Sequence, residues 1–301
     1  MNLNQRSDLQ CSEIARINHV PLIGTAIQGD MWLLIEYLDR WEAKAFEQSK
    51  IPDAVKVHIE AANISKKQVR TLLIKQPKNR NHGGINFFIA LPSQMNPQLF
   101  FYHLKKYEDI LDIDLASIAS GEFFDSSHLW LKPLYLVCTN GRRDICCSIY
   151  GPDVFRVVAE EAGDAAWQSS HIGGHNKAPV ILFFPDGVNY GFANPIEARK
   201  LVKAYQNKSI VLDYYRGRVC YESHLQAAEH FWRLDTGIMD LPGLHIADVS
   251  LLNEDEWLVK IIGMDGEVSE IHLKSHISEF AIPVTCSNSK EKPITTYHRL
   301  I

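Results

Sequence analysis

The chain has 301 residues, of which 46% are hydrophobic and 22% are charged, with a formal net charge of −5. This length suits two domains, and the composition is that of a globular protein whose core needs no disulfides. With this mild acidic excess, no basic field indicates nucleic-acid binding, and we expect no nucleic-acid partner. No apolar run approaches the roughly 20 residues of a membrane-spanning helix, and the first 20 residues lack the apolar stretch of a signal peptide. We therefore expect a cytoplasmic protein with no membrane partner.

Two strands and a helical region open the first half of the chain. Residues 32–37 form an apolar strand-like run, residues 43–64 carry helical spacing with Val55 and Ile59 on one face, and residues 71–75 read as a second strand. A third strand is predicted over 85–91. Asn96-Pro97 then has the pattern of a helix start, with Asn as the cap and Pro in the first turn.

The second half repeats this order. A strand at 134–137 precedes a helix predicted over 152–162, which Gly163 ends. Strands at 179–184 and 188–193 flank the turn signal Pro185-Asp186-Gly187. Asn194 then begins another helix, with Glu197 placed for a capping box. The repeated order predicts an α/β protein with two tandem thioredoxin-like domains.

A smaller β region follows a helix predicted over 223–233. Strands are expected at 257–262, 268–273 and 280–285, and the last dozen residues are polar and expected to fray. We place the boundaries at 1–115 for a first thioredoxin-like domain without ligands, 116–235 for a second with the metal site, and 236–301 for a C-terminal β appendage.

Two short motifs in the second half carry the chemistry. Cys138 follows a strand at the sheet edge where α/β proteins usually bind ligands, and Cys147 comes nine residues later, before the predicted helix. His171 and His175 stand four residues apart, but Gly173-Gly174 between them favours a loop over a regular helix. We expect that loop to wrap closely, with the glycines leaving space for a bulky cofactor. Two thiolates and two imidazoles suit either tetrahedral zinc or a [2Fe–2S] cluster with one Cys pair and one His pair.

The remaining cysteines are interpreted as thiols without a chemical role. Stable disulfides are unusual in the cytoplasm, so Cys11, Cys220 and Cys286 are expected to be structural thiols. Cys146 is interpreted as a spare buried thiol. Adjacent cysteines pair only with strain and no C-x-x-C motif occurs, which disfavours the alternative of a thioredoxin- or peroxiredoxin-like thiol enzyme.

The chain resembles the sucrase/ferredoxin-like family, a branch of thioredoxin-like ferredoxins. The resemblance is carried by Gly24-Thr-Ala26, Trp32 to Glu36, Leu136 to Cys147, Ser170 to His175, Tyr215-Arg-Gly-Arg218 and Gln226-Ala-Ala-Glu229. It implies a [2Fe–2S] cluster bound by the C-x8-C pair, Cys138 and Cys147, and the H-x3-H pair, His171 and His175.

The resemblance implies an electron carrier or reductase component that works with a redox partner protein. Arg142 and Arg143 stand beside the centre, where they can offset cluster charge or dock an acidic partner, or act as solvated loop residues. Enzymatic activity stays undecided. Sucrase activity is not expected, since no carboxylate pair reads as that of a glycosidase.

Overall fold

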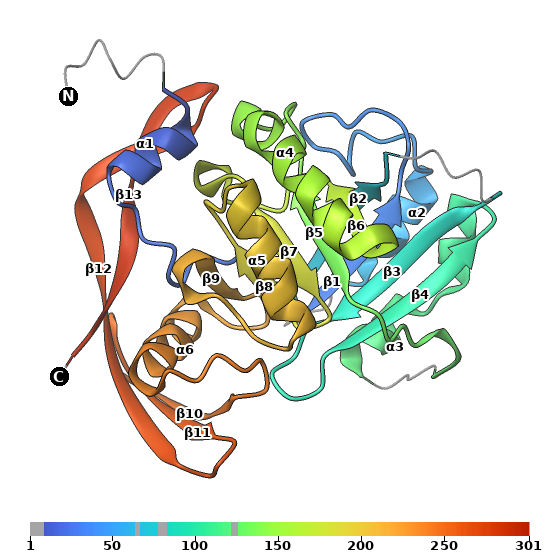
Figure 1. Cartoon of the computed structure of the whole chain (residues 1–301). Helices are drawn as coiled ribbons and strands as arrows, with labels where there is room; N and C mark the ends of the chain where they lie inside the picture. Colours follow the sequence, from blue (N-terminus) through green and yellow to red (C-terminus); the bar gives the residue numbers. More distant parts are fainter. Residues whose placement is uncertain (1–8, 64–66, 78–82, 122–125, 301) are drawn as a thin grey trace.

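A nine-stranded sheet runs through the molecule and includes strands from both halves of the chain (Figure 1). The computed structural model describes residues 9–63, 67–77, 83–121 and 126–300. In the order in which they pair, the strands are β4 (Gln98–Leu104), β3 (Ile85–Leu91), β1 (Met31–Glu36), β2 (Val69–Lys75), β6 (Ala166–Ser169), β5 (Leu134–Cys138), β7 (Ile181–Phe184), β8 (Val188–Tyr190) and β9 (Tyr215–Arg218).

The two halves have the same strand order and directions. β1 is parallel to β2 and antiparallel to β3, which is antiparallel to β4. In the second half, β5 is parallel to β6 and antiparallel to β7, which is antiparallel to β8. The halves join where β2 and β6 pair antiparallel, with Ile74 opposite Ser169. The mixed α/β fold is therefore confirmed, and the two halves share one continuous sheet.

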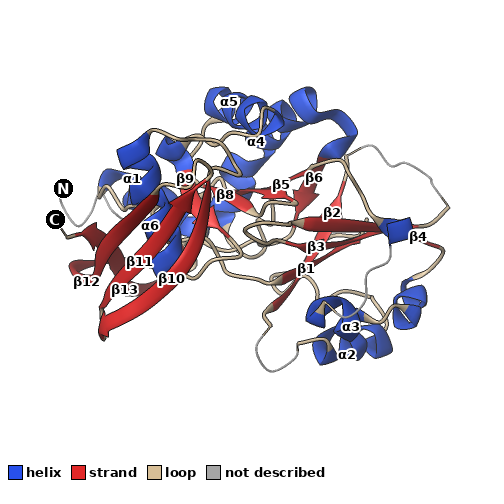
Figure 2. Cartoon of the chain, turned by 90° about the horizontal axis from the view of Figure 1, so that it is seen from below, coloured by secondary structure: helices blue, strands red, loops and turns tan. Residues whose placement is uncertain are grey.

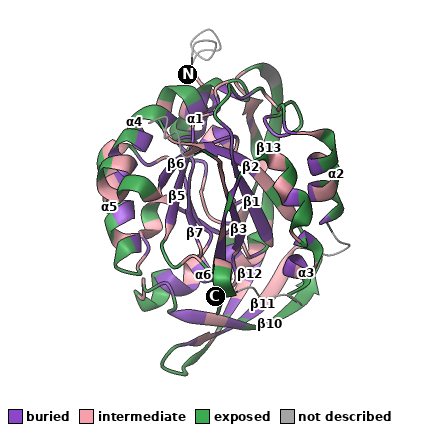
Figure 3. Cartoon of the chain, turned by 90° about the vertical axis from the view of Figure 1, so that its right-hand side faces the viewer, coloured by how far each residue is buried: buried purple, intermediate pink, exposed green. Residues whose placement is uncertain are grey.

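Helices cover the outer faces of this curled sheet. They are α2 (Asp53–Ala61) and α3 (Leu115–Ser120) on the first half, and α4 (Ile145–Ala162) and α5 (Pro195–Gln206) on the second. Figures 2 and 3 show the two pairs on opposite sides of the molecule with strands between them. The inner faces meet in a shared core, where Trp32 contacts Phe184 with ring centroids 5.7 Å apart. This burial ties the halves together and holds the end of β5 inside the protein.

A second sheet lies beside the first. It contains β10 (Leu244–Asn253), β11 (Glu256–Gly263), β12 (Val268–Thr285) and β13 (Asn288–Arg299), in that order. The helix α6 (Ser223–Thr236) packs its Ala227 and Trp232 on this sheet. The β12–β13 hairpin extends along one side of the molecule to α1 (Cys11–Ile17), where Ile282 packs on Ala15 (Figure 1). The hairpin thereby brings its turn close to the N-terminal helix.

Several predicted elements differ from the observed ones. Asn96-Pro97 precedes β4 and no helix, because the following residues pair with β3 and this tertiary pairing overrides a local cap signal. The segment expected to fray is mostly β13, held by pairing with β12. β6 and β10 were not predicted, and the expected strands at 268–273 and 280–285 are parts of the single strand β12. Among the described residues, no helix is both long enough and apolar enough to cross a membrane.

Candidate metal centre

Two cysteines approach each other where β5 ends and α4 begins. Cys138 is the last residue of β5, and Cys147 lies in the first turn of α4, which begins at Ile145 and not at Pro152 as predicted. The helix starts early because the Asp144 carboxylate accepts a hydrogen bond from the backbone N–H of Cys146 at 3.0 Å, as an N-cap does. Both thiols are fully buried. A rigid strand end and a capped helix thus position the two sulfurs.

The first histidine lies against both sulfurs. Nδ1 of His171 is 4.0 Å from Sγ of Cys138 and 4.0 Å from Sγ of Cys147. These three donor atoms all lie within 4.8 Å of one another, so the group can hold a metal ion. His171 itself is only partly buried.

The second histidine lies beside the first and outside this group of three donors. Nδ1 of His175 is 3.4 Å from Nε2 of His171, while its own Nε2 donates to the backbone carbonyl of Val284 and lies 3.6 Å from the Asp144 carboxylate. A carbonyl only accepts, so Nε2 carries the proton and Nδ1 keeps its lone pair. Partners of this kind fix the ring orientation of a metal-binding histidine.

The protonation states favour metal binding. A hydrogen bond from the Cys147 thiol holds the pKa of Cys138 well below its usual value, with His171 adding to the effect. The same hydrogen bond and burial raise the pKa of Cys147, so the pair shares one proton. Burial lowers the pKa of His175, which keeps the imidazole neutral. One thiolate and a neutral imidazole are therefore available before any metal arrives.

Two glycines shape the loop that carries the histidines. Gly173 has a φ of +114° and Gly174 a φ of +76°, both in the region that favours glycine. A Cβ atom at Gly173 would lie 2.5 Å from Ile27, and one at Gly174 would lie 2.4 Å from Nη2 of Arg216. The space that we expected for a bulky cofactor is thus filled by protein side chains. The glycines allow the loop to pack closely against Ile27 and Arg216.

Arg216 anchors this loop. Its buried guanidinium donates to the carbonyl of Gly173 at 3.1 Å, to the hydroxyl of Thr25 at 3.1 Å and to the carbonyl of Thr25. Sequence reasoning noted Arg216 only as part of a motif; the structure shows that this motif connects the histidine loop to the segment around residue 25.

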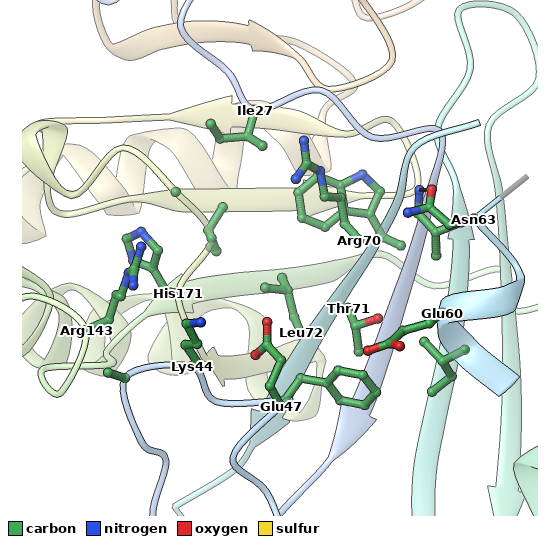
Figure 4. Close-up of a pocket in the computed structure, with 17 residues that line it drawn as sticks. Ile27, Lys44, Glu47, Glu60, Asn63, Arg70, Thr71, Leu72, Arg143 and His171 are labelled. Atoms are coloured by element: carbon green, nitrogen blue, oxygen red, sulfur yellow. Dashed lines mark hydrogen bonds between the residues drawn. The ribbon is translucent and has the colours of Figure 1, made fainter. Parts of the chain in front are cut away.

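A cavity of about 510 Å³ opens beside the centre (Figure 4). His171 and Arg143 line one end of it, and Lys44, Glu47 and Arg70 from the first half contribute charged groups farther along. Arg142 is exposed and does not line the cavity. Of the two arginines, Arg143 is therefore the one that shares a surface with a candidate ligand.

Comparison with known proteins identifies the family of this chain. Residues 22–217 match the profile of the sucrase/ferredoxin-like family. The chain belongs to the sucrase/ferredoxin-like family. The sucrase/ferredoxin-like match includes both motifs and Arg216, and it ends before α6 and the second sheet.

A curated relative is similar over a shorter stretch. Altered inheritance of mitochondria protein 32 of Meyerozyma guilliermondii is 31% identical over 97 residues, which make up 29% of this chain and 34% of that protein. The match therefore spans about a third of that relative's length. No solved structure matches the chain.

The structure also shows site residues that sequence reasoning missed. Asp144 contacts both His175 and the start of α4, and Cys11 and Cys286 meet the supposedly spare Cys146. A sequence signal existed for Asp144, because Asp directly before a helix is a preferred cap. No signal in the sequence paired Cys11 with Cys286, which are 275 residues apart.

Proposed function

We propose that this protein is a ferredoxin-like electron carrier whose [2Fe–2S] cluster is bound by Cys138, Cys147, His171 and His175. The observation that carries the proposal is the pairing of donors: two buried thiols lie together at the end of β5, and two imidazoles lie together on the adjoining loop. A thiol pair on one iron and an imidazole pair on the other is a known ligand set for such a cluster. Membership of the sucrase/ferredoxin-like family supports this reading.

The residues fit such a cluster if one ring turns. His171 now lies between the thiols and His175, with weak contacts of 4.0 Å to each sulfur. Its ring borders the cavity, which gives it room to move outward. Nδ1 of His175 now contacts Nε2 of His171 and would be released when that ring turns, while Nε2 of His175 stays bonded to the Val284 carbonyl. The cluster would supply reversible transfer of one electron, and the protein would hold its two irons in different ligand fields.

The proposal assigns different roles to the two halves. The shared strand order of the halves supports our interpretation of each as a thioredoxin-like unit, and the first half offers no thiol or imidazole corresponding to Cys138 among its described residues. The first half supports the second and borders the cavity, where Arg143 can meet an acidic redox partner protein. All six cysteines are free thiols, consistent with a reducing compartment such as the cytoplasm.

Matched cysteine variants test the proposal. The anaerobically purified protein should absorb visible light, and Cys138→Ser should abolish or strongly change that absorption. Cys220→Ser removes a thiol outside the centre and should leave the spectrum unchanged. Equal spectra for the two variants would exclude Cys138 as a cluster ligand.

A single zinc ion is the second candidate. It is favoured by the position of His171, whose Nδ1 is equally close to both sulfurs, as in the coordination shell of one tetrahedral ion. Zinc has no redox chemistry, so the protein would then be a structural or binding module. A colourless protein with one zinc ion that Cys138→Ser removes would favour this candidate over the cluster.

A further inference from the structure

Three cysteines from distant parts of the chain meet next to the Cys/His centre. Cys11 begins α1, Cys146 lies in the first turn of α4, and Cys286 lies in the turn between β12 and β13. The Sγ atom of Cys11 lies 3.4 Å from Sγ of Cys146 and 3.2 Å from Sγ of Cys286. The Sγ atoms of Cys146 and Cys286 are 3.2 Å apart. The three sulfurs thus form a nearly equilateral triangle, which we call the three-cysteine cluster.

A carboxylate completes the group. The Asp144 oxygens lie 3.8 and 4.0 Å from Sγ of Cys11, and the four donor atoms all lie within 4.8 Å of one another. Asp144 is buried, and backbone N–H groups of Cys146 and Cys286 hold its two oxygens at 3.0 and 2.9 Å. Its position is therefore fixed before any ion binds.

We propose that Cys11, Cys146, Cys286 and Asp144 form a second metal site that takes one Zn²⁺ ion. Zinc prefers four ligands in a tetrahedron, with sulfur at about 2.3 Å, which puts sulfurs about 3.8 Å apart. The observed triangle is slightly smaller than this face of a tetrahedron, so the site needs a modest expansion. Binding replaces three S–H bonds by three Zn–S bonds and releases three protons to solvent.

The surroundings suit thiolates. The backbone N–H of Cys11 donates to Sγ of Cys286 at 3.2 Å, and that of Ser12 donates to the Cys146 sulfur. Lys177 is buried, and this burial lowers the pKa of its side chain to about 7, while Cys11 acts to raise it. No described carboxylate forms an ion pair with this side chain. Three thiolates and a carboxylate around Zn²⁺ carry two negative charges in excess, and the protonated form of Lys177 would offset one of them. Buried charges are normally paired, and the proposed complex supplies that pairing.

The site connects to the Cys/His centre without being part of it. Cys146 precedes Cys147 on α4, and Asp144 lies 3.6 Å from His175. Val284, which accepts the hydrogen bond from His175, is two residues before Cys286. A bound ion would therefore fix the hairpin turn over the second histidine and join it to α1 and α4.

Zinc content and zinc coordination test the proposal. Protein purified anaerobically and reconstituted with iron and sulfide should contain one zinc ion per chain, and Cys286→Ser should lose it. Cys220→Ser, a cysteine outside both groups, should retain it, and so should Cys138→Ser. X-ray absorption at the zinc edge should report three sulfur ligands and one lighter ligand. Cobalt added to apoprotein should give thiolate charge-transfer bands that Cys286→Ser weakens by more than tenfold.

The contrary results are equally specific. Two sulfurs and two nitrogens around zinc, with loss of zinc in Cys138→Ser, would place the ion in the Cys/His centre and overturn the proposal. A disulfide among the three cysteines in anaerobic protein, or no zinc and no cobalt signal in the folded chain, would also overturn it. Because Cys286→Ser can fail to fold, Cys286→His serves as a second variant, and it should retain zinc with one sulfur fewer. Iron content, measured on the same samples, reports separately on the proposed cluster.

Discussion

Replacing Gly174 by alanine tests how the histidine loop is held. At φ +76° an alanine costs roughly 1–2 kcal/mol, because its Cβ crowds the backbone. The same Cβ would lie 2.4 Å from Nη2 of Arg216 and 2.9 Å from Cζ, so the buried guanidinium has to move. Overpacking of this kind costs about 1–3 kcal/mol. Together these costs should lower the free energy of unfolding of Gly174→Ala by about 2–5 kcal/mol.

Gly237→Ala is the matched control. Gly237 has a φ of +71° and ends α6, and a Cβ there meets nothing within 4 Å. Alanine at this position therefore has the same unfavourable backbone conformation but no steric clash. The change that alanine makes to the entropy of the unfolded chain is the same in both variants and cancels in the comparison. Urea unfolding should show Gly174→Ala to be less stable than Gly237→Ala by about 1–3 kcal/mol. Metal should also dissociate faster from Gly174→Ala. Equal stability and equal metal retention in the two variants would refute the role assigned to Arg216.

Three further predictions concern charge and ligation. Glu229→Gln removes the carboxylate that lies 2.9 Å from the fully buried Arg233. It should lower the free energy of unfolding, measured by urea unfolding, by about 3–5 kcal/mol, and a loss below about 1 kcal/mol would contradict this prediction. Arg143→Gln removes a positive charge beside the centre and should lower the midpoint potential of the centre. Arg156→Gln, on the exposed face of α4, should leave that potential unchanged. Equal potentials in the two variants would show that Arg143 has no electrostatic effect on the centre. If the cluster still assembles, His175→Cys should have a lower midpoint potential than the unsubstituted protein, because a thiolate donates more charge to iron than an imidazole. An unchanged potential would show that His175 is not a ligand.

Local patterns predicted much of the second half. The Asn194 cap with Glu197 starts α5 as expected, because both partners lie within one turn and need no distant contact. The two ligand motifs were found for the same reason, since each is compact in the sequence. Prediction failed where long-range strand pairing determines the structure. The residues after Asn96-Pro97, for example, form β4 because they pair with β3. The predicted start of α4, at Pro152, lies seven residues after the observed start at Ile145, because proline usually begins a helix and here lies inside one.

The approach of distant segments could not be predicted from spacing. Cys11 and Cys286 meet because the β12–β13 hairpin extends to α1, and this depends on one long strand that was predicted as two short ones. The position of Val284 over His175 follows from the same strand. Composition likewise gave no indication that the sheets of the two halves join at β2 and β6.

Pulsed EPR on protein labelled with ¹⁵N-histidine tests the central proposal most directly. After anaerobic reduction by one electron, the account predicts an EPR signal with two strongly coupled histidine nitrogens, and His175→Cys should leave one. Iron and acid-labile sulfide should each be present at two atoms per chain. A colourless, EPR-silent protein, or a cluster signal without directly bound histidine nitrogen, would contradict the proposed ligation by Cys138, Cys147, His171 and His175.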